Sequence, residues 1–169
     1  MRIVIDGRAR LLGDDVSTDA IILSRRKKET LDPAVLCRYL LESVDPDFAG
    51  SVRPGDLLVA GKNFGCGSAM EVAVTVVLAA GVRAVLARSF SRTYYRNAIN
   101  NGLVPIECDT SGIEEGNLLD AVLDDSGIRV LNQTRGSEIS GNPLPEVMLA
   151  ILSAGGLIPY FRLNRDFRA

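Results

Sequence analysis

The chain has 169 residues, of which 47% are hydrophobic and 24% are charged, and its formal net charge is −2. This length and composition predict one globular domain over residues 1–169, with a core of its own. The charge balance argues against the clustered basic face of a nucleic-acid-binding protein, and the absence of a long uncharged apolar run argues against a membrane span.

The N-terminal segment RIVIDGRARLL, residues 2–12, alternates apolar and polar positions and predicts a short strand or a hairpin that turns at Gly7. It has no apolar stretch typical of a secretory signal. The next segment, GDDVSTDAII at 13–22, begins with acids and turn-forming residues and then becomes apolar. This change predicts a turn that leads into an apolar strand.

A polar loop over residues 24–33 carries the four consecutive cations RRKK. At its end, Asp32 and Pro33 are the residue types preferred at the N-cap and first position of a helix. Apolar residues at helical spacing follow, so a helix is expected over residues 34–43.

The centre of the chain alternates short apolar runs with longer segments and predicts a βαβαβ unit with a parallel sheet. The β-branched residues of its first helix leave a strand as an alternative there. In chain order, the expected elements are a strand at residues 57–60, a Gly-rich turn at 63–68, and a helix at 69–80 that is closed by Gly81. A strand at 83–88, a helix at 89–102 that is closed by Gly102, and a strand at 103–108 follow.

The C-terminal part separates into two regions. Residues 109–141 hold strand-length apolar segments between Gly, Asp and Asn turns, which predicts an antiparallel β segment. Residues 143–162 predict an amphipathic terminal helix that is stopped by Gly155 and Gly156.

Histidine is absent, so no Ser-His or Cys-His pair operates within this chain. The three cysteines, Cys37, Cys66 and Cys108, are far apart in the sequence. Neither a disulfide framework nor a self-contained zinc or iron–sulfur site is expected, and no metal ligands are assigned. This cysteine usage fits a reducing cytoplasm.

The Gly-rich turn places Ser68 directly after Gly67, between a predicted strand and a predicted helix. Glycines let a ligand approach the backbone closely, and the N–H groups at a helix start favour a carboxylate, a phosphate or a developing oxyanion. The alternative is that Ser68 only caps the helix and the glycines only form the turn. The turn is neither a dinucleotide fingerprint nor a P-loop, because no GK[ST] follows.

Two further segments carry unusual polar residues. In residues 89–103, Arg92 and Arg96 are four positions apart and share a helix face beside two tyrosines, which indicates either a functional surface or a solvated cationic face. The three acids of segment 13–22, among them Asp19, form a cluster for which turn capping is the ordinary explanation.

Taken together, the segments GDDVSTDAII, GKNFGCGS and SFSRTYYRNAINNGL resemble, in order and spacing, the small subunits of the 3-isopropylmalate dehydratase (isopropylmalate isomerase) family. These subunits match the swivelling fourth domain of the aconitase family. The resemblance extends from about Gly7 to about Arg162. It implies an α/β fold, a swivelling β/β/α domain with a central parallel βαβαβ core and an additional antiparallel β segment.

The resemblance also implies a two-chain hydro-lyase that dehydrates and rehydrates an isopropylmalate-like 2-hydroxy acid, in leucine biosynthesis or a related pathway with an altered substrate. The cofactor, a [4Fe-4S] cluster that acts as a Lewis acid, is expected in a large partner subunit, and none in this chain. Ser68 corresponds to the serine that acts as the base on the substrate carbon, stabilised by the amides of the turn. Asp19 corresponds to an active-site aspartate, and Gly67, Ala69 and Met70 lie at substrate-binding positions.

The sequence departs from the family pattern G-S-S-R-E-H at three positions of the turn. Ala69 replaces the second serine, Met70 replaces the arginine that grips a substrate carboxylate, and Val72 replaces the histidine, whereas Glu71 is kept. The loss of arginine removes a bidentate carboxylate clamp.

Three interpretations of this loss are open. The substrate carries an apolar group at that place, or Arg25 or Arg26 replaces the clamp, or the subunit is catalytically inert. Because Ser68 and Asp19 are kept, the first two interpretations together are favoured. A non-catalytic interaction subunit and a stand-alone anion-binding domain remain the alternative functions.

Overall fold

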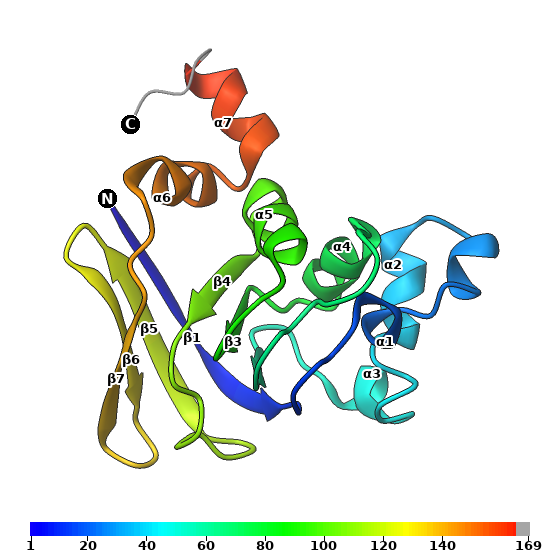
Figure 1. Ribbon diagram of the computed structural model, residues 1–169, viewed down its shortest axis with the longest axis horizontal. Coiled ribbons are helices and arrows are strands. Elements are labelled where there is room, and N and C mark those ends of the chain that lie inside the picture. Colours follow the sequence, from blue (N-terminus) through cyan, green and yellow to red (C-terminus); the bar gives the residue numbers. More distant parts are fainter. Residues whose placement is uncertain (165–169) are drawn as a thin grey trace.

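The computed structural model describes residues 1–164, which form seven strands and seven α-helices (Figure 1). The strands are β1 (Arg2–Leu11), β2 (Leu57–Ala60), β3 (Ala84–Ala87), β4 (Val104–Glu107), β5 (Leu118–Asp124), β6 (Gly127–Asn132) and β7 (Ser137–Gly141). The helices are α1 (Thr18–Ile21), α2 (Pro33–Leu36), α3 (Phe48–Ser51), α4 (Val72–Ala79), α5 (Arg92–Asn101), α6 (Glu146–Ser153) and α7 (Leu157–Asn164). Two 3₁₀ turns, Arg26–Lys28 and Cys37–Tyr39, lie between the first helices.

The seven strands form one sheet in the order β4-β3-β2-β1-β5-β6-β7. Strands β2, β3 and β4 are parallel neighbours joined by α4 and α5, so the predicted βαβαβ unit is confirmed. Strands β5, β6 and β7 pair antiparallel, as expected for the region after Cys108. The expected α/β fold with an additional antiparallel segment is therefore present.

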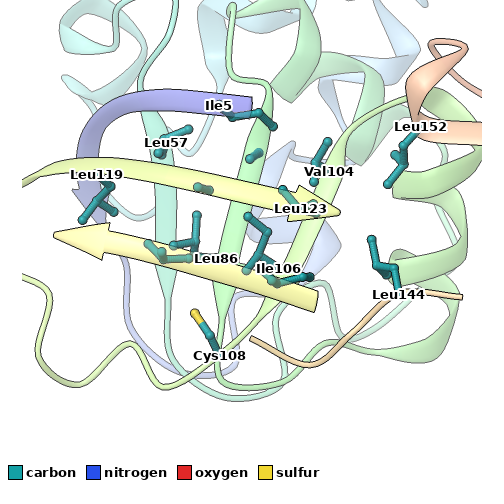
Figure 2. Packing of buried hydrophobic residues seen from close by; sticks show 14 of the residues in the cluster. Ile5, Leu57, Leu86, Val104, Ile106, Cys108, Leu119, Leu123, Leu144 and Leu152 are labelled. Carbon is teal, nitrogen blue, oxygen red and sulfur yellow. The ribbon is translucent and has the colours of Figure 1, made fainter. Parts of the chain in front are cut away.

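The antiparallel half of the sheet folds over one face of the parallel half. Figure 2 shows Leu57 and Leu86 of the parallel strands close to Leu119 and Leu123 of β5, within one buried cluster. A second buried cluster on the opposite face includes Leu58 and packs against α4. The layers are thus β, β and α, and the period-two alternation of β2 and β3 supplies residues to both cores.

Strand β1 connects the two halves; the strand expected here is present, but the expected turn at Gly7 is not. It runs without a hairpin through Gly7, because residues 2–8 pair antiparallel with β5 and residues 9–11 pair parallel with β2. A Cβ atom on Gly7 would lie 2.0 Å from the carbonyl oxygen of Gly55. Glycine is required here for close approach of two backbones, and not for a turn.

Two local predictions near the N-terminus were partly wrong. The expected strand at the end of segment 13–22 is the short helix α1, which Ser17 caps by accepting a hydrogen bond from the Ala20 amide at 3.0 Å. Asp32 caps α2 as predicted, but the expected helix over 34–43 is interrupted at Leu36 and continues only as a 3₁₀ turn. The chain then reverses at Leu41, which has a φ of 57°.

The last two helices replace the single terminal helix that was expected. Helix α6 ends at Ser153 before the predicted Gly155–Gly156 stop, and α7 follows. In the described part of the chain, no single helix is long and apolar enough to cross a membrane; only α6 and α7 together pass that test, and they are bent by 96°.

Candidate active site

The Gly-rich turn after β2 lies beside the segment that follows β1. The Gly65 amide donates to the Val16 carbonyl, and the Thr18 amide donates to the Cys66 carbonyl, each at 2.8 Å. The Thr18 hydroxyl donates to the Ser68 carbonyl, also at 2.8 Å. The backbone on both sides of the turn is therefore fixed at the carboxyl ends of two parallel strands, where ligands bind in open α/β sheets.

The segment that follows β3 holds the other side of the turn. The Phe64 amide donates to the Ser89 carbonyl at 3.0 Å, and the Ser91 amide donates to the Phe64 carbonyl at 2.9 Å. The Ser91 hydroxyl also donates to the Gly65 carbonyl at 2.7 Å. The three segments that carried the family resemblance thus meet in space.

The conformation of the turn explains its glycines. Asn63, Gly65 and Gly67 have φ angles of 59°, 77° and 91°, in the left-handed region that favours glycine and asparagine. A Cβ atom on Gly65 would lie 2.2 Å from Cγ of Tyr94. That ring packs edge-on against Phe64, with centroids 5.1 Å apart, so the turn rests on an aromatic cluster.

Ser68 is exposed at the outer side of this turn. Helix α4 begins four residues later at Val72, and its N-cap is Glu71 without a side-chain cap bond. The alternative that Ser68 only caps the helix is therefore wrong, and so is the expected helix start at Ala69. Within residues 1–164, the Ser68 hydroxyl makes no hydrogen bond, and the six amides from Gly67 to Val72 donate to no acceptor.

These amides form the kind of environment that stabilises negative charge. They precede the first turn of α4, where the helix dipole is positive. An oxyanion at or near Ser68 would therefore find unpaired donors and a favourable field. The geometry fits both a developing alkoxide and a bound carboxylate.

Asp19 lies in the first turn of α1, one residue after Thr18, and its side chain is exposed. Its carboxylate accepts hydrogen bonds from the Ser24 hydroxyl at 2.7 Å and from the Ser24 amide at 2.9 Å. These two bonds, with a smaller contribution from the Lys27 charge, lower the pKa of Asp19. Asp19 therefore keeps its negative charge beside the turn.

The two arginines expected to replace the clamp have different surroundings. Arg26 forms a bidentate pair with Glu42, with both N–O distances at 2.8 Å, and lies 3.8 Å from the centre of the Tyr39 ring. Arg25 is 69% exposed, and its guanidinium is 3.7 Å from Glu42. Both arginines thus face Glu42.

The cation that reaches the turn is Lys27, which sequence reasoning missed. Its ammonium lies 2.7 Å from the sulfur of Met70, whose side chain is only 8% exposed. Gly67 and Ala69 are exposed beside Ser68. The run of four cations was visible in the sequence, but no pattern in it indicated which one folds back onto the turn.

The arginine pair of α5 lies in a different place. Arg92 and Arg96 are exposed and line a cavity with Tyr95 and Glu107 that does not include the turn. The contribution of this segment to the site comes instead from the backbone near Ser91 and from the ring of Tyr94.

The three cysteines do not form a metal site. Within residues 1–164, no group of three or more His, Cys, Asp or Glu side chains could hold a metal ion. Cys37 and Cys66 are partly exposed, and Cys108 is buried, which raises its thiol pKa to about 12. These residues do not fit an iron–sulfur cluster.

Fold and site together define a domain of the aconitase class, and the family model for the aconitase C-terminal domain matches residues 40–111. The chain is 46% identical over 162 residues to 3-isopropylmalate dehydratase small subunit 2 of Archaeoglobus fulgidus, covering 96% of this chain and 97% of that protein. It is 44% identical to the isopropylmalate/citramalate isomerase small subunit of Methanocaldococcus jannaschii, covering 96% of each.

A solved structure supports the same assignment. The crystal structure of 3-isopropylmalate dehydratase from Methanocaldococcus jannaschii superposes with a TM-score of 0.89 at 39% identity, over 96% of both chains. The chain therefore belongs to the family of 3-isopropylmalate dehydratase small subunits.

Proposed function

We propose that this chain is the small subunit of a two-chain hydro-lyase that isomerises an isopropylmalate-like 2-hydroxy acid by dehydration and rehydration. Family membership supports the reaction class. The observation that carries the proposal is the exposed Ser68 hydroxyl, which lies in a segment whose six amides from Gly67 to Val72 have no acceptor within residues 1–164. The pathway is leucine biosynthesis or a related one with an altered substrate.

The partner is a large subunit that holds a [4Fe-4S] cluster, since residues 1–164 of this chain offer no ligand set for one. When bound, the cluster supplies Lewis acidity at the leaving hydroxyl. The small subunit then has to supply the base for the carbon-bound proton. The family resemblance assigns this role to Ser68, which is exposed in the turn.

A serine hydroxyl is a weak base unless its deprotonated form is stabilised. The unpaired amides from Gly67 to Val72 and the start of α4 supply that stabilisation. In the dehydration step, the Ser68 alkoxide takes the proton from the carbon next to the carbinol carbon, the C–H electron pair forms the C=C bond, and the hydroxyl leaves as hydroxide with the electron pair of the C–O bond. Rehydration reverses these events, with hydroxyl and proton exchanged between the two carbons.

The open position of Ser68 supports the proposal that a second chain is needed. The alkoxide form of an exposed serine is poorly stabilised, because its electrostatic interactions with the neighbouring amides become strong only when water is excluded from the site. The large subunit would cover the turn and complete the site. Asp19, which is also exposed next to Thr18, would lie at the same covered surface.

One observation favours a second function, that of a non-catalytic interaction subunit. Ala69 and Met70 stand where the resembling family has a serine and an arginine, so the turn has lost two polar side chains. In that case the fold and the interface would remain while the large subunit carried all of the chemistry.

Reconstitution separates the two functions. The chain is produced together with a large subunit of the 3-isopropylmalate dehydratase family, and each chain alone and the pair are assayed with 2-isopropylmalate, citramalate and other alkyl malates. We expect turnover of at least one of these acids by the pair and none by either chain alone. Full activity of the large subunit alone would contradict the proposal and support the interaction subunit.

A further inference from the structure

Lys27 differs from the other cations of its loop. It lies in the 3₁₀ turn Arg26–Lys28 between α1 and α2, and its side chain is half-buried, whereas Arg25 and Lys28 are exposed. Arg26 is also half-buried, but its guanidinium is satisfied by Glu42. Lys27 is thus the cation of this loop that is withdrawn from water without a carboxylate within ion-pair distance in the described residues.

The present partner of Lys27 is a poor one. Its ammonium has three donors, and within residues 1–164 it donates only to the thioether sulfur of Met70, at 2.7 Å. A thioether is a weak acceptor, and an incompletely satisfied charge that is half-buried costs free energy. An incoming carboxylate would be a much better partner for this group.

The position of Lys27 relates it to the proposed base. Met70 follows Ser68 by two residues, and the Ser68 carbonyl is held by the hydroxyl of Thr18. Asp19 follows directly, and the Lys27 charge is close enough to contribute to lowering its pKa. The ammonium of Lys27 therefore contacts the segment that carries Ser68, and its charge acts on Asp19 beside it.

We propose that Lys27 binds a carboxylate of the hydroxy-acid substrate and takes the place of the arginine that is missing at position 70. This inference rests on the proposed function. Met70 is 8% exposed and offers a substrate almost no apolar surface, so an alkyl group in place of the carboxylate would gain little there. The substrate therefore keeps its carboxylate at this place, and the cation that holds it comes from a different segment of the chain.

The chemical consequence is that the substrate carboxylate is held less rigidly than it would be by an arginine. An arginine holds a carboxylate through two parallel hydrogen bonds, whereas an ammonium acts as a point charge on a flexible stem. The site then fixes the charge of the substrate more than its orientation, which fits a broader range of alkyl malates.

The test uses steady-state kinetics of the reconstituted pair with 2-isopropylmalate, or with the alkyl malate that the pair turns over best. Lys27→Met is expected to raise KM about 10- to 100-fold, as for the loss of a hydrogen-bonded charge pair. Lys27→Arg should keep KM within a few-fold of the original protein. The control Lys28→Met removes an exposed cation from the same turn and should leave KM unchanged.

A rescue experiment separates binding from folding. Met70→Arg in the Lys27→Met background puts the family's cation back into the turn and should restore most of the lost affinity. Should Lys27→Met fail to assemble with the large subunit, Lys27→Gln is measured instead, and the same rise in KM is expected.

Two outcomes would overturn the inference. A normal KM for Lys27→Met or Lys27→Gln excludes Lys27 as the carboxylate ligand, and a raised KM for Arg25→Met alone would assign that role to Arg25. In either case, loss of turnover in Ser68→Ala keeps the proposed function intact. Normal turnover in Ser68→Ala would instead reject the role of this chain as the source of the base.

Discussion

Ser68 combines an exposed side chain with a fixed backbone. The Thr18 hydroxyl holds its carbonyl at 2.8 Å, whereas its own hydroxyl has no partner within residues 1–164. A hydrogen-bonded backbone keeps the residue in place, and the unpaired hydroxyl remains available for chemistry. This arrangement is typical of a functional residue on a rigid element.

Asp19 gives the first prediction at this scale. Its pKa is lowered mainly by the Ser24 hydroxyl, so Ser24→Ala should raise the pKa of Asp19 toward the ordinary value of about 3.9. Removing a hydrogen bond to the Asp19 carboxylate disfavours its charged form, so the pKa of Asp19 rises. The measurement is a carboxyl-carbon NMR titration of the isolated chain.

The matched control for this titration is Ser43→Ala, because Ser43 is exposed and donates to the Ala20 carbonyl, and not to Asp19. It should leave the Asp19 titration unchanged. If Ser24→Ala also left the Asp19 pKa unchanged, the Ser24 hydroxyl would not be the main cause of the low value.

The sequence predicted some of these residues and missed others for a physical reason. Ser68 could be singled out because a serine after glycines near an expected strand end is a local signal, whereas Asp19 was assigned only through the family resemblance. Lys27 could not, because its contact with Met70 joins residues 43 positions apart. Such a contact is decided by how α1 and the following loop pack, which single-sequence patterns do not show.

At the level of elements, the Gly-rich turn depends on Gly65 for two separate reasons. Its φ is 77°, and an added Cβ would lie 2.2 Å from the Tyr94 ring. Gly65→Ala should therefore lower the free energy of unfolding by about 3 kcal/mol or more, through backbone strain and overpacking combined. Urea unfolding of the isolated chain measures this change.

Gly136 provides the control for strain alone. It has a φ of 66° and lies in an exposed turn, with no atom within 4 Å of an added Cβ. Gly136→Ala should cost only about 1 kcal/mol, the usual penalty of a left-handed alanine. An equal decrease in the free energy of unfolding of the two variants would contradict a steric contact between the Tyr94 ring and an added Cβ atom at position 65.

Helix α1 shows where pattern reading fails for short elements. The apolar residues after Asp19 indicated a strand, but Ser17 caps a helix of four residues there. The Leu41 amide donates to the Ile21 carbonyl at 2.9 Å, so a distant segment supplies the partner that ends this helix. Over so few residues, the apolar periodicity of a helix cannot be distinguished from that of a strand.

For the whole molecule, the sequence predicted the βαβαβ unit and the antiparallel region, but not how they meet. Their strand-length apolar segments and the turn residues between them are local signals, so both could be read directly. The folding of β5 and β6 over the parallel strands depends on β1, which pairs with both halves of the sheet. Gly7 was interpreted as a turn, because a close approach to Gly55 leaves no signal in sequence.

The whole assembly also sets the conditions for chemistry. The proposed base is exposed to water in this chain, where an alkoxide is poorly stabilised. Turnover is therefore expected to be a property of the covered, two-chain site and to be absent from the small subunit alone.

The most direct test of the account is turnover by the reconstituted pair that carries Ser68→Ala, beside the control Ser153→Ala, which removes an exposed serine of α6. We predict that Ser68→Ala assembles normally and lowers kcat by at least about 10³-fold, because the base and its stabilised charge are lost, whereas the control keeps full activity. Normal turnover by a fully assembled Ser68→Ala pair would contradict the account.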